Sequence, residues 1–95
     1  MIFRRDISKK LRKQTIKSTR DNYLKEINYI LDKCNAESLK GERKCSIRIS
    51  ELMDGKINYE IGKIAYKLVY YFNVSTSLTA KIENGYKEDS ILILW

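Results

Sequence analysis

Residues 57–72 read INYEIGKIAYKLVYYF, and this stretch places a different kind of side chain on each of its two faces. At about 3.6 residues per turn, six apolar residues fall on one stripe: Ile57, Ile61, Ile64, Ala65, Leu68 and Phe72. This spacing predicts a helix whose apolar stripe lies on a hydrophobic core. Asn58 is the expected N-cap of that helix, and Asn73 is its expected end.

The opposite face of the same predicted helix combines aromatic rings with ammonium groups. Its residues are Tyr59, Lys63, Tyr66, Lys67 and Tyr70, with Tyr71 at the boundary. A small protein has little reason to expose several large rings to water, so we expect this face to meet a partner. The alternative is that Tyr66 and Tyr70 pack beneath the first helix of the chain, with their hydroxyl groups at the rim.

The net charge of +7 is concentrated at the N-terminus. The first twenty residues contain eight basic side chains and one acidic one, whereas the rest of the chain contains eleven of each. The eight basic residues are Arg4, Arg5, Lys9, Lys10, Arg12, Lys13, Lys17 and Arg20. Such an asymmetry predicts a polyanionic partner, nucleic acid first and an anionic membrane surface second. The alternative is a solvated arm that only aids solubility.

Two apolar stripes near the N-terminus are out of phase with each other. The first consists of Phe3, Ile7 and Leu11, four residues apart. The second consists of Ile16, Tyr23, Ile27, Ile30, Leu31 and Cys34. We therefore expect either a bend between Leu11 and Thr19, or a first stripe that contacts something other than the core.

Capping and turn residues suggest where the second helix begins and ends. Residues 18–21, Ser-Thr-Arg-Asp, resemble a capping box and predict a helix start there. The helix is expected to reach about Lys33, with Asn35 as its stop, and residues 37–44, ESLKGERK, are expected to form a loop. We divide the chain into a basic arm or short amphipathic helix at 1–17 and one compact domain at 18–95.

Three segments have the pattern of strands. Cys45, Ile47 and Ile49 alternate with polar residues, as do Leu78, Ala80 and Ile82 within 77–83. The final segment, 91–95, is apolar on both faces, and residues 53–56 are expected to form a turn.

The turn that joins the last two strands decides their pairing. A two-residue turn at Asn84-Gly85 would set Ile82 against Lys87, whereas a longer loop at 84–89 pairs Ile82 with Ile91 and Ala80 with Ile93. We favour the longer loop because it sets apolar residues opposite apolar residues.

These elements predict an α+β fold in the order α(α)βαββ. A three-stranded, largely antiparallel sheet would carry both long helices on one face, because the outer faces of the first two strands are polar. Leu92 and Leu94 would then lie on the outer face, at a contact.

The residue types offer little for catalysis or metal binding. The chain has no histidine, its acidic residues are scattered, and no phosphate-binding loop occurs, so we expect no enzyme activity and no cofactor. Cys34 and Cys45 alone cannot complete a zinc site, and we expect them to be free, buried thiols rather than a disulfide.

No apolar run is long enough to span a membrane, and the N-terminus lacks the pattern of a signal peptide, so we expect an intracellular, cytoplasmic protein. The thin N-terminal stripe, interrupted by Asp6, argues against a helix lying in a membrane surface. The absence of Pro and His beside abundant Ile, Lys, Asn and Tyr is typical of an AT-rich genome, such as that of a phage.

The leading hypothesis is a small non-enzymatic protein that associates with nucleic acid. The basic arm would bind phosphates, and the Tyr/Lys helix face would add contacts. The alternative is a protein-binding module, for instance a phage-type inhibitor that docks on a host enzyme, or a homodimer. Docking would then use the Tyr-rich face or the apolar last strand.

Overall fold

The structure is a computed structural model that describes residues 4–52 and 58–95, with the side chains of residues 7–52 and 63–95. The elements along the chain are α1 (Arg4–Asn22), α2 (Leu24–Leu39), β1 (Lys44–Arg48), the 3-10 helix η1 (Ile49–Leu52), α3 (Asn58–Ser75), β2 (Thr79–Glu83) and β3 (Ser90–Leu94). The predicted α+β class and the order of elements are confirmed. The turn predicted at 53–56 lies outside the described residues.

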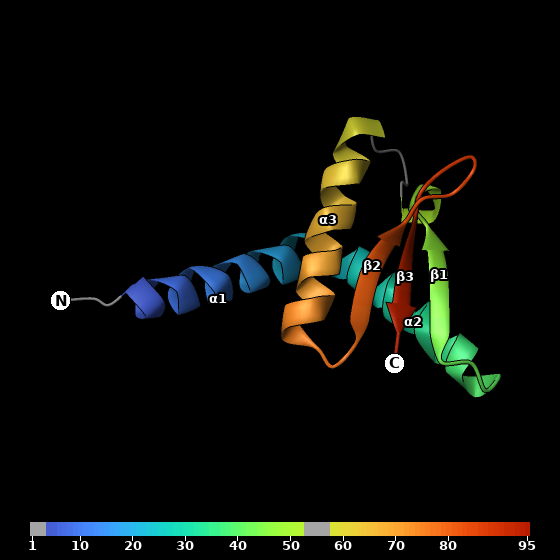
Figure 1. Ribbon diagram of the computed structural model, residues 1–95, viewed down its shortest axis with the longest axis horizontal. Helices are drawn as coiled ribbons and strands as arrows, with labels where there is room; N and C mark the ends of the chain where they lie inside the picture. The colour runs from blue at the N-terminus through green and yellow to red at the C-terminus, as the bar shows by residue number, and fades with distance from the viewer. Residues whose placement is uncertain (1–3, 53–57) are drawn as a thin grey trace.

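The sheet has the order β1-β3-β2, and both pairings are antiparallel. The last strand of the chain is therefore the central one (Figure 1). The inward residues form two rows across the sheet, Cys45–Ile93–Ala80 and Ile47–Ile91–Ile82. The pairing of β2 with β3 is the one that the longer loop predicts. It is favoured because it brings apolar side chains together on the face that the helices cover.

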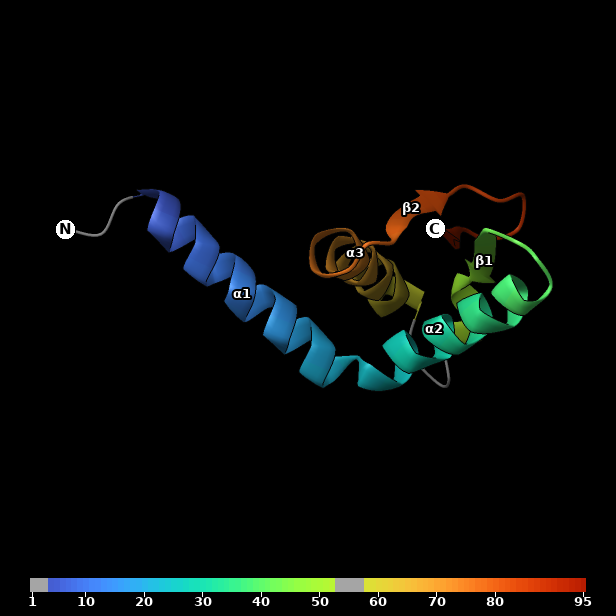
Figure 2. The same ribbon diagram turned by 90° about the horizontal axis from the view of Figure 1, so that it is seen from below.

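Both long helices of the body lie on the same face of the sheet, α2 against β1 and α3 against β2 (Figures 1 and 2). The helices bury Ile27, Ile30 and Cys34 from α2, and Ile64, Ala65, Leu68 and Phe72 from α3. The described part of the predicted α3 stripe is thus confirmed; the side chains of Ile57 and Ile61 lie outside the description. Leu92 and Leu94 are partly exposed on the uncovered face, as predicted.

The N-terminal helix bends later than the sequence predicted. α1 runs without interruption to Asn22, and the direction changes at Tyr23, whose φ is −125° and ψ is 29°. The Tyr23 N–H still donates to the Thr19 carbonyl at 2.9 Å, and the Ile27 N–H donates to the Tyr23 carbonyl at 2.9 Å. Of the two alternatives that the out-of-phase stripes offered, the bend between Leu11 and Thr19 does not occur, and the exposure of Ile7 and Leu11 agrees with the second, a stripe away from the core. The helix start predicted at 18–21 is wrong.

The position of the core explains this difference. Ile7 and Leu11 are 44% and 55% exposed, so the described part of the first stripe does not touch the core. Tyr23 packs against the core and Thr19 is buried one turn before it, whereas the N-terminal turns of α1 project away from the body (Figures 1 and 2). The helix continues until the first large side chain that has to turn toward the core, and it changes direction there. Leu31, predicted to face the core, is 39% exposed.

α2 ends at Leu39, not near Asn35 as predicted. The Gly41 N–H donates to the Ser38 carbonyl at 3.0 Å, and the Glu42 N–H donates to the Glu37 carbonyl at 3.1 Å. This is the Schellman arrangement, which requires a left-handed residue after the helix, and Gly41 supplies it with φ of 87°. The first part of the predicted 37–44 loop is consequently helical.

α3 also continues past its predicted end, Asn73, and reaches Ser75. The Asn73 side chain instead binds the free edge of β2. Its Nδ2 donates to the Ala80 carbonyl at 2.8 Å, and its Oδ1 accepts from the Ala80 N–H at 2.7 Å. One side-chain amide thus satisfies both backbone groups that a neighbouring strand would otherwise bind.

We expect Asn73→Ala to lower the free energy of unfolding by about 1–3 kcal/mol, because it leaves the partly buried Ala80 backbone groups without partners. The measurement is urea denaturation. Asn28→Ala is the matched control, since Asn28 is an exposed helical asparagine whose side chain has no hydrogen-bond partner among the described residues. Equal stability of the two variants would show that the amide does not support the sheet.

Candidate functional site

The predicted basic residues lie on a helix that extends from the body (Figures 1 and 2). The side chains with described surroundings are all exposed: Lys9, Lys10, Arg12, Lys13, Lys17 and Arg20. Arg4 and Arg5 belong to α1, but their side chains lie outside the description. The arm is therefore a cationic helix surrounded mostly by solvent.

None of the α1 cations with a described side chain lines the cleft between α1 and α3. Lys9, Lys13 and Lys17 follow one another at intervals of four residues, which places them on one side of the helix. Like charges at this spacing repel and destabilise the helix. Arg20 has a partner in Asp21, with 3.9 Å between the guanidinium and the carboxylate. Among the described residues, the three lysines have no acidic partner.

A cleft of about 360 Å³ separates the other side of α1 from α3. Its α1 lining is uncharged and includes Leu11, Thr15 and Ser18. Lys67 lines it from α3, and its ammonium lies 5.6 Å from the centre of the Tyr23 ring. This cation–π contact places Lys67 at the base of the arm. Lys67 is exposed, and it also links α3 to the bend between α1 and α2.

The described part of the Tyr/Lys face points to solvent. Tyr66 is 71% exposed and Tyr70 is 38% exposed, and Lys63 is also exposed. The alternative in which Tyr66 and Tyr70 pack beneath the first helix is therefore wrong. Tyr71 is half-buried, with its ring edge-to-face against Phe72 at 5.5 Å between centroids. Tyr59 belongs to α3, but its side chain lies outside the description.

Glu51 forms a polar cluster that sequence reasoning missed. It accepts hydrogen bonds from the Tyr29 hydroxyl at 2.8 Å, from the Lys33 ammonium and from the Arg48 N–H at 2.8 Å. Burial alone would raise the pKa of the Glu51 carboxyl, but the hydrogen bonds from Lys33, Arg48 and Tyr29 outweigh burial and lower it. The cluster holds α2 to η1.

Glu88 has a similar role in the loop between β2 and β3. It accepts from the Ser50 N–H at 3.0 Å and from the Ser50 hydroxyl at 2.9 Å. Its partner is 38 residues away in the chain, so no local sequence signal could have shown this contact. Glu51 and Glu88 are thus acceptors that hold the fold together.

Cys34 and Cys45 are free and buried, as predicted. Burial raises the pKa of the Cys34 thiol to about 12, and the neighbouring Cys45 adds to this shift. Burial also raises the pKa of Cys45, with the charge of Glu37 contributing. Both side chains therefore stay protonated at neutral pH and pack as small apolar groups. The described residues contain no group of His, Cys, Asp or Glu side chains that could hold a metal ion.

Comparisons of this chain with protein-family models, with curated proteins and with solved structures find no match. Of the described helices, none has both the length and the apolar character needed to cross a lipid bilayer.

The Cys34 thiol makes the free energy of unfolding decrease as the pH rises through the alkaline range. Its ordinary pKa is 9.0 and its folded pKa is about 12, so its contribution is complete below pH 9 and is lost as pH rises toward 12. The wild-type free energy of unfolding should therefore fall more steeply over this range than that of Cys34→Ala, by at most about 1.4 kcal/mol per pH unit. Urea denaturation at several pH values measures both slopes.

Leu31→Ala, an exposed and non-ionising change on the same helix, is the control and should keep the wild-type slope. If Cys34→Ala keeps that slope as well, the thiol does not titrate as its burial implies.

Proposed function

We propose that this chain is a non-enzymatic nucleic-acid-binding protein, in which the cationic side of α1 binds phosphates and the Tyr/Lys face of α3 adds contacts. The observation that carries the proposal is the exposure of the cations on a helix that projects from the body. Basic residues spread evenly over a surface would serve solubility equally well. Basic residues gathered on one projecting helix produce a local positive potential that attracts a polyanion.

The spacing of the arm lysines suits a phosphate backbone. Lys9, Lys13 and Lys17 follow one another at about 6 Å along the helix axis. Duplex DNA carries one charge per roughly 1.7 Å of its axis, so each lysine has a phosphate within reach. Bound phosphates would also relieve the repulsion between the three ammonium groups, which no described acidic residue offsets. Binding and helix stability are thereby coupled in the arm.

The exposed rings of α3 supply a second kind of contact. Tyr66 and Tyr70 are one helical turn apart and exposed, and Lys63 lies on the same face. An exposed tyrosine ring can stack on an unpaired base, a contact of about 1–3 kcal/mol per base in single-strand binders. Because every base offers a ring face, this contact implies affinity without sequence preference. We therefore assign the larger share of affinity to α1 and a moderate share to the rings.

The triple variant Lys9→Gln, Lys13→Gln, Lys17→Gln should bind nucleic acid more weakly and with a shallower dependence on salt. For every lysine that no longer binds a phosphate, the slope of log affinity against log salt should become shallower by about 0.9 on duplex DNA. Fluorescence anisotropy with labelled single- and double-stranded DNA and RNA, at about 50 and 200 mM salt, measures both quantities.

The matched control replaces three exposed lysines of the body, Lys40, Lys81 and Lys87, by Gln, which changes the net charge equally. This control should keep most of the affinity and the slope. The proposal fails if the two triple variants behave alike, or if the intact chain shows no binding at the lower salt.

Exposed apolar residues favour a second candidate function, a protein-binding module. Ile7 and Leu11 are exposed on α1, as is Tyr66 on α3. A protein partner would bury these side chains, and binding would then depend little on salt. Under this alternative, Tyr66→Ala and Tyr70→Ala would reduce binding to that partner far more than neutralising the arm lysines.

A further inference from the structure

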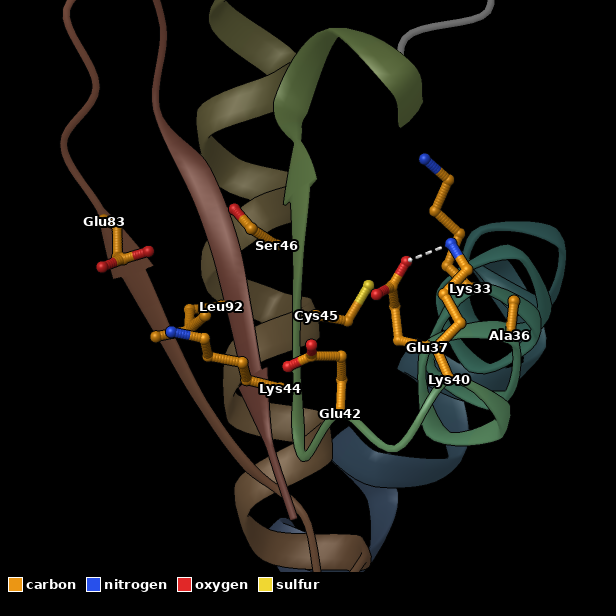
Figure 3. A pocket seen from close by; sticks show the side chains of 10 residues that line it. All are labelled: Lys33, Ala36, Glu37, Lys40, Glu42, Lys44, Cys45, Ser46, Glu83 and Leu92. Atoms are coloured by element: carbon orange, nitrogen blue, oxygen red, sulfur yellow. Dashed lines mark hydrogen bonds and ion pairs between the residues drawn. The ribbon is translucent and has the colours of Figure 1, made fainter.

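The charge on α1 has one sign, unlike that of the groove on the body. Residues 7–20 contain six basic side chains and no acidic one. A groove of about 750 Å³ beside β1, by contrast, carries both signs (Figure 3). Its lining contains three lysines and three glutamates: Lys33, Lys40, Lys44, Glu37, Glu42 and Glu83. The Lys40 ammonium already donates to Glu37 at 3.4 Å. A polyanion is therefore drawn to α1 rather than to this groove.

The N-terminal part of α1 stands clear of the body (Figure 2). Every side chain from Ile7 to Thr15 is exposed, whereas Ile16 is half-buried and Thr19 is buried. Residues 4–15 span about 18 Å, the length of about five base pairs of duplex DNA. An α-helix with its side chains is about 10–12 Å across, and the major groove of B-DNA is about 12 Å wide. The free part of α1 therefore has the dimensions that a major groove admits.

The cations occupy two flanks of α1 as well as the side between them. At about 100° per residue, Lys10 and Arg12 lie about 160° apart around the helix axis. Lys9 and Lys13 lie between them, and all four side chains are exposed. A helix that lies on a single phosphate backbone needs only one row of cations. Two flanks match the two backbones that border a groove.

Within residues 7–20, the side of α1 toward the cleft is uncharged. Leu11, Thr15 and Ser18 line that cleft, and Ile7 precedes Leu11 by about one turn. The major groove is about 8.5 Å deep, so it immerses only part of a helix that is 10–12 Å across. The uncharged side can thus stay outside the groove, toward α3, while the cationic side lies inside it.

The shape of the groove separates duplex DNA from other nucleic acids. The major groove of A-form RNA is deep and narrow, and side chains cannot read it. A single strand has one backbone and offers no groove. Of these ligands, only duplex DNA places phosphates on both flanks of an inserted helix.

We infer that the preferred ligand of α1 is duplex DNA, with the helix in the major groove and Lys10 and Arg12 against opposite backbones. This inference rests on the function proposed above, to which it adds the class of nucleic acid and the groove. Stacking on α3 needs an unpaired base, so Tyr66 and Tyr70 contribute to single strands and not to a fully paired duplex.

DNA with a filled major groove tests the inference on the full chain. In one labelled duplex the cytosines are replaced by glucosylated 5-hydroxymethylcytosine, whose sugars occupy the major groove and leave the phosphates unchanged. Fluorescence anisotropy should show binding weaker by about tenfold or more to this duplex, and to duplex RNA of the same sequence, than to plain DNA. The control duplex carries 5-methylcytosine at the same positions and should bind as plain DNA does.

The variants Lys10→Gln and Arg12→Gln test the two flanks separately. Each removes a cation from one side of the groove, so each should make the slope of log affinity against log salt shallower by about 0.9 on duplex DNA. Lys87→Gln makes the same charge change on an exposed loop residue of the body and should keep the wild-type slope. Tyr66→Ala should keep the wild-type affinity for the duplex.

Two results would overturn the inference and leave the proposed function standing. One is equally tight binding of the glucosylated duplex or of duplex RNA. The other is a wild-type slope in either Lys10→Gln or Arg12→Gln, because α1 would then not lie between two backbones. Absence of binding to every nucleic acid at about 50 mM salt would remove the proposed function and the inference together.

Discussion

The fold depends on the insertion of β3 between β1 and β2. Ile91 and Ile93 of this strand are fully buried, each lies between an inward residue of β1 and one of β2, and both helices of the body cover them. β1 and β2 do not pair with each other, so no sheet exists until the last residues of the chain have joined them. Contacts that are distant in sequence therefore have to form before the core is complete. The Glu88–Ser50 hydrogen bonds support the same region.

The two ends of the molecule, α1 at one and β1 at the other, have different surfaces. The two body helices cover one face of the sheet, and α1 is buried only near its C-terminal end, at Thr19, so its N-terminal turns project from the body with their cations exposed. At the other end, β1 is an edge strand whose outward backbone groups are only partly occupied. The first surface is the one that we propose binds a polyanion, because exposed cationic side chains dominate it.

The candidate site was predictable to the extent that it depends on local spacing. The separation of apolar and Tyr/Lys faces on α3 follows from helical periodicity, and Tyr66 and Tyr70 are indeed exposed. The contact of Lys67 with Tyr23 was not predictable, because it depends on where α1 meets α3. Glu51 and Asn73 were missed for a related reason. Their partners lie on other elements, and both residue types are equally common on solvated surfaces.

The sequence by itself determined the class and order of the elements, the buried face of α3 and the register of β2 with β3, because each follows from the periodicity of apolar residues. It also located the excess charge in the first twenty residues. The end of α2 follows the local cap at Gly41. Only the tertiary structure decided where α1 bends, where α3 ends, and which polar side chains have partners on other elements. The bend falls at Tyr23 because its side chain packs against the core. α3 passes Asn73 because the Asn73 amide binds the Ala80 backbone of β2. Local capping preferences contribute only about 1 kcal/mol, so such tertiary contacts outweigh them.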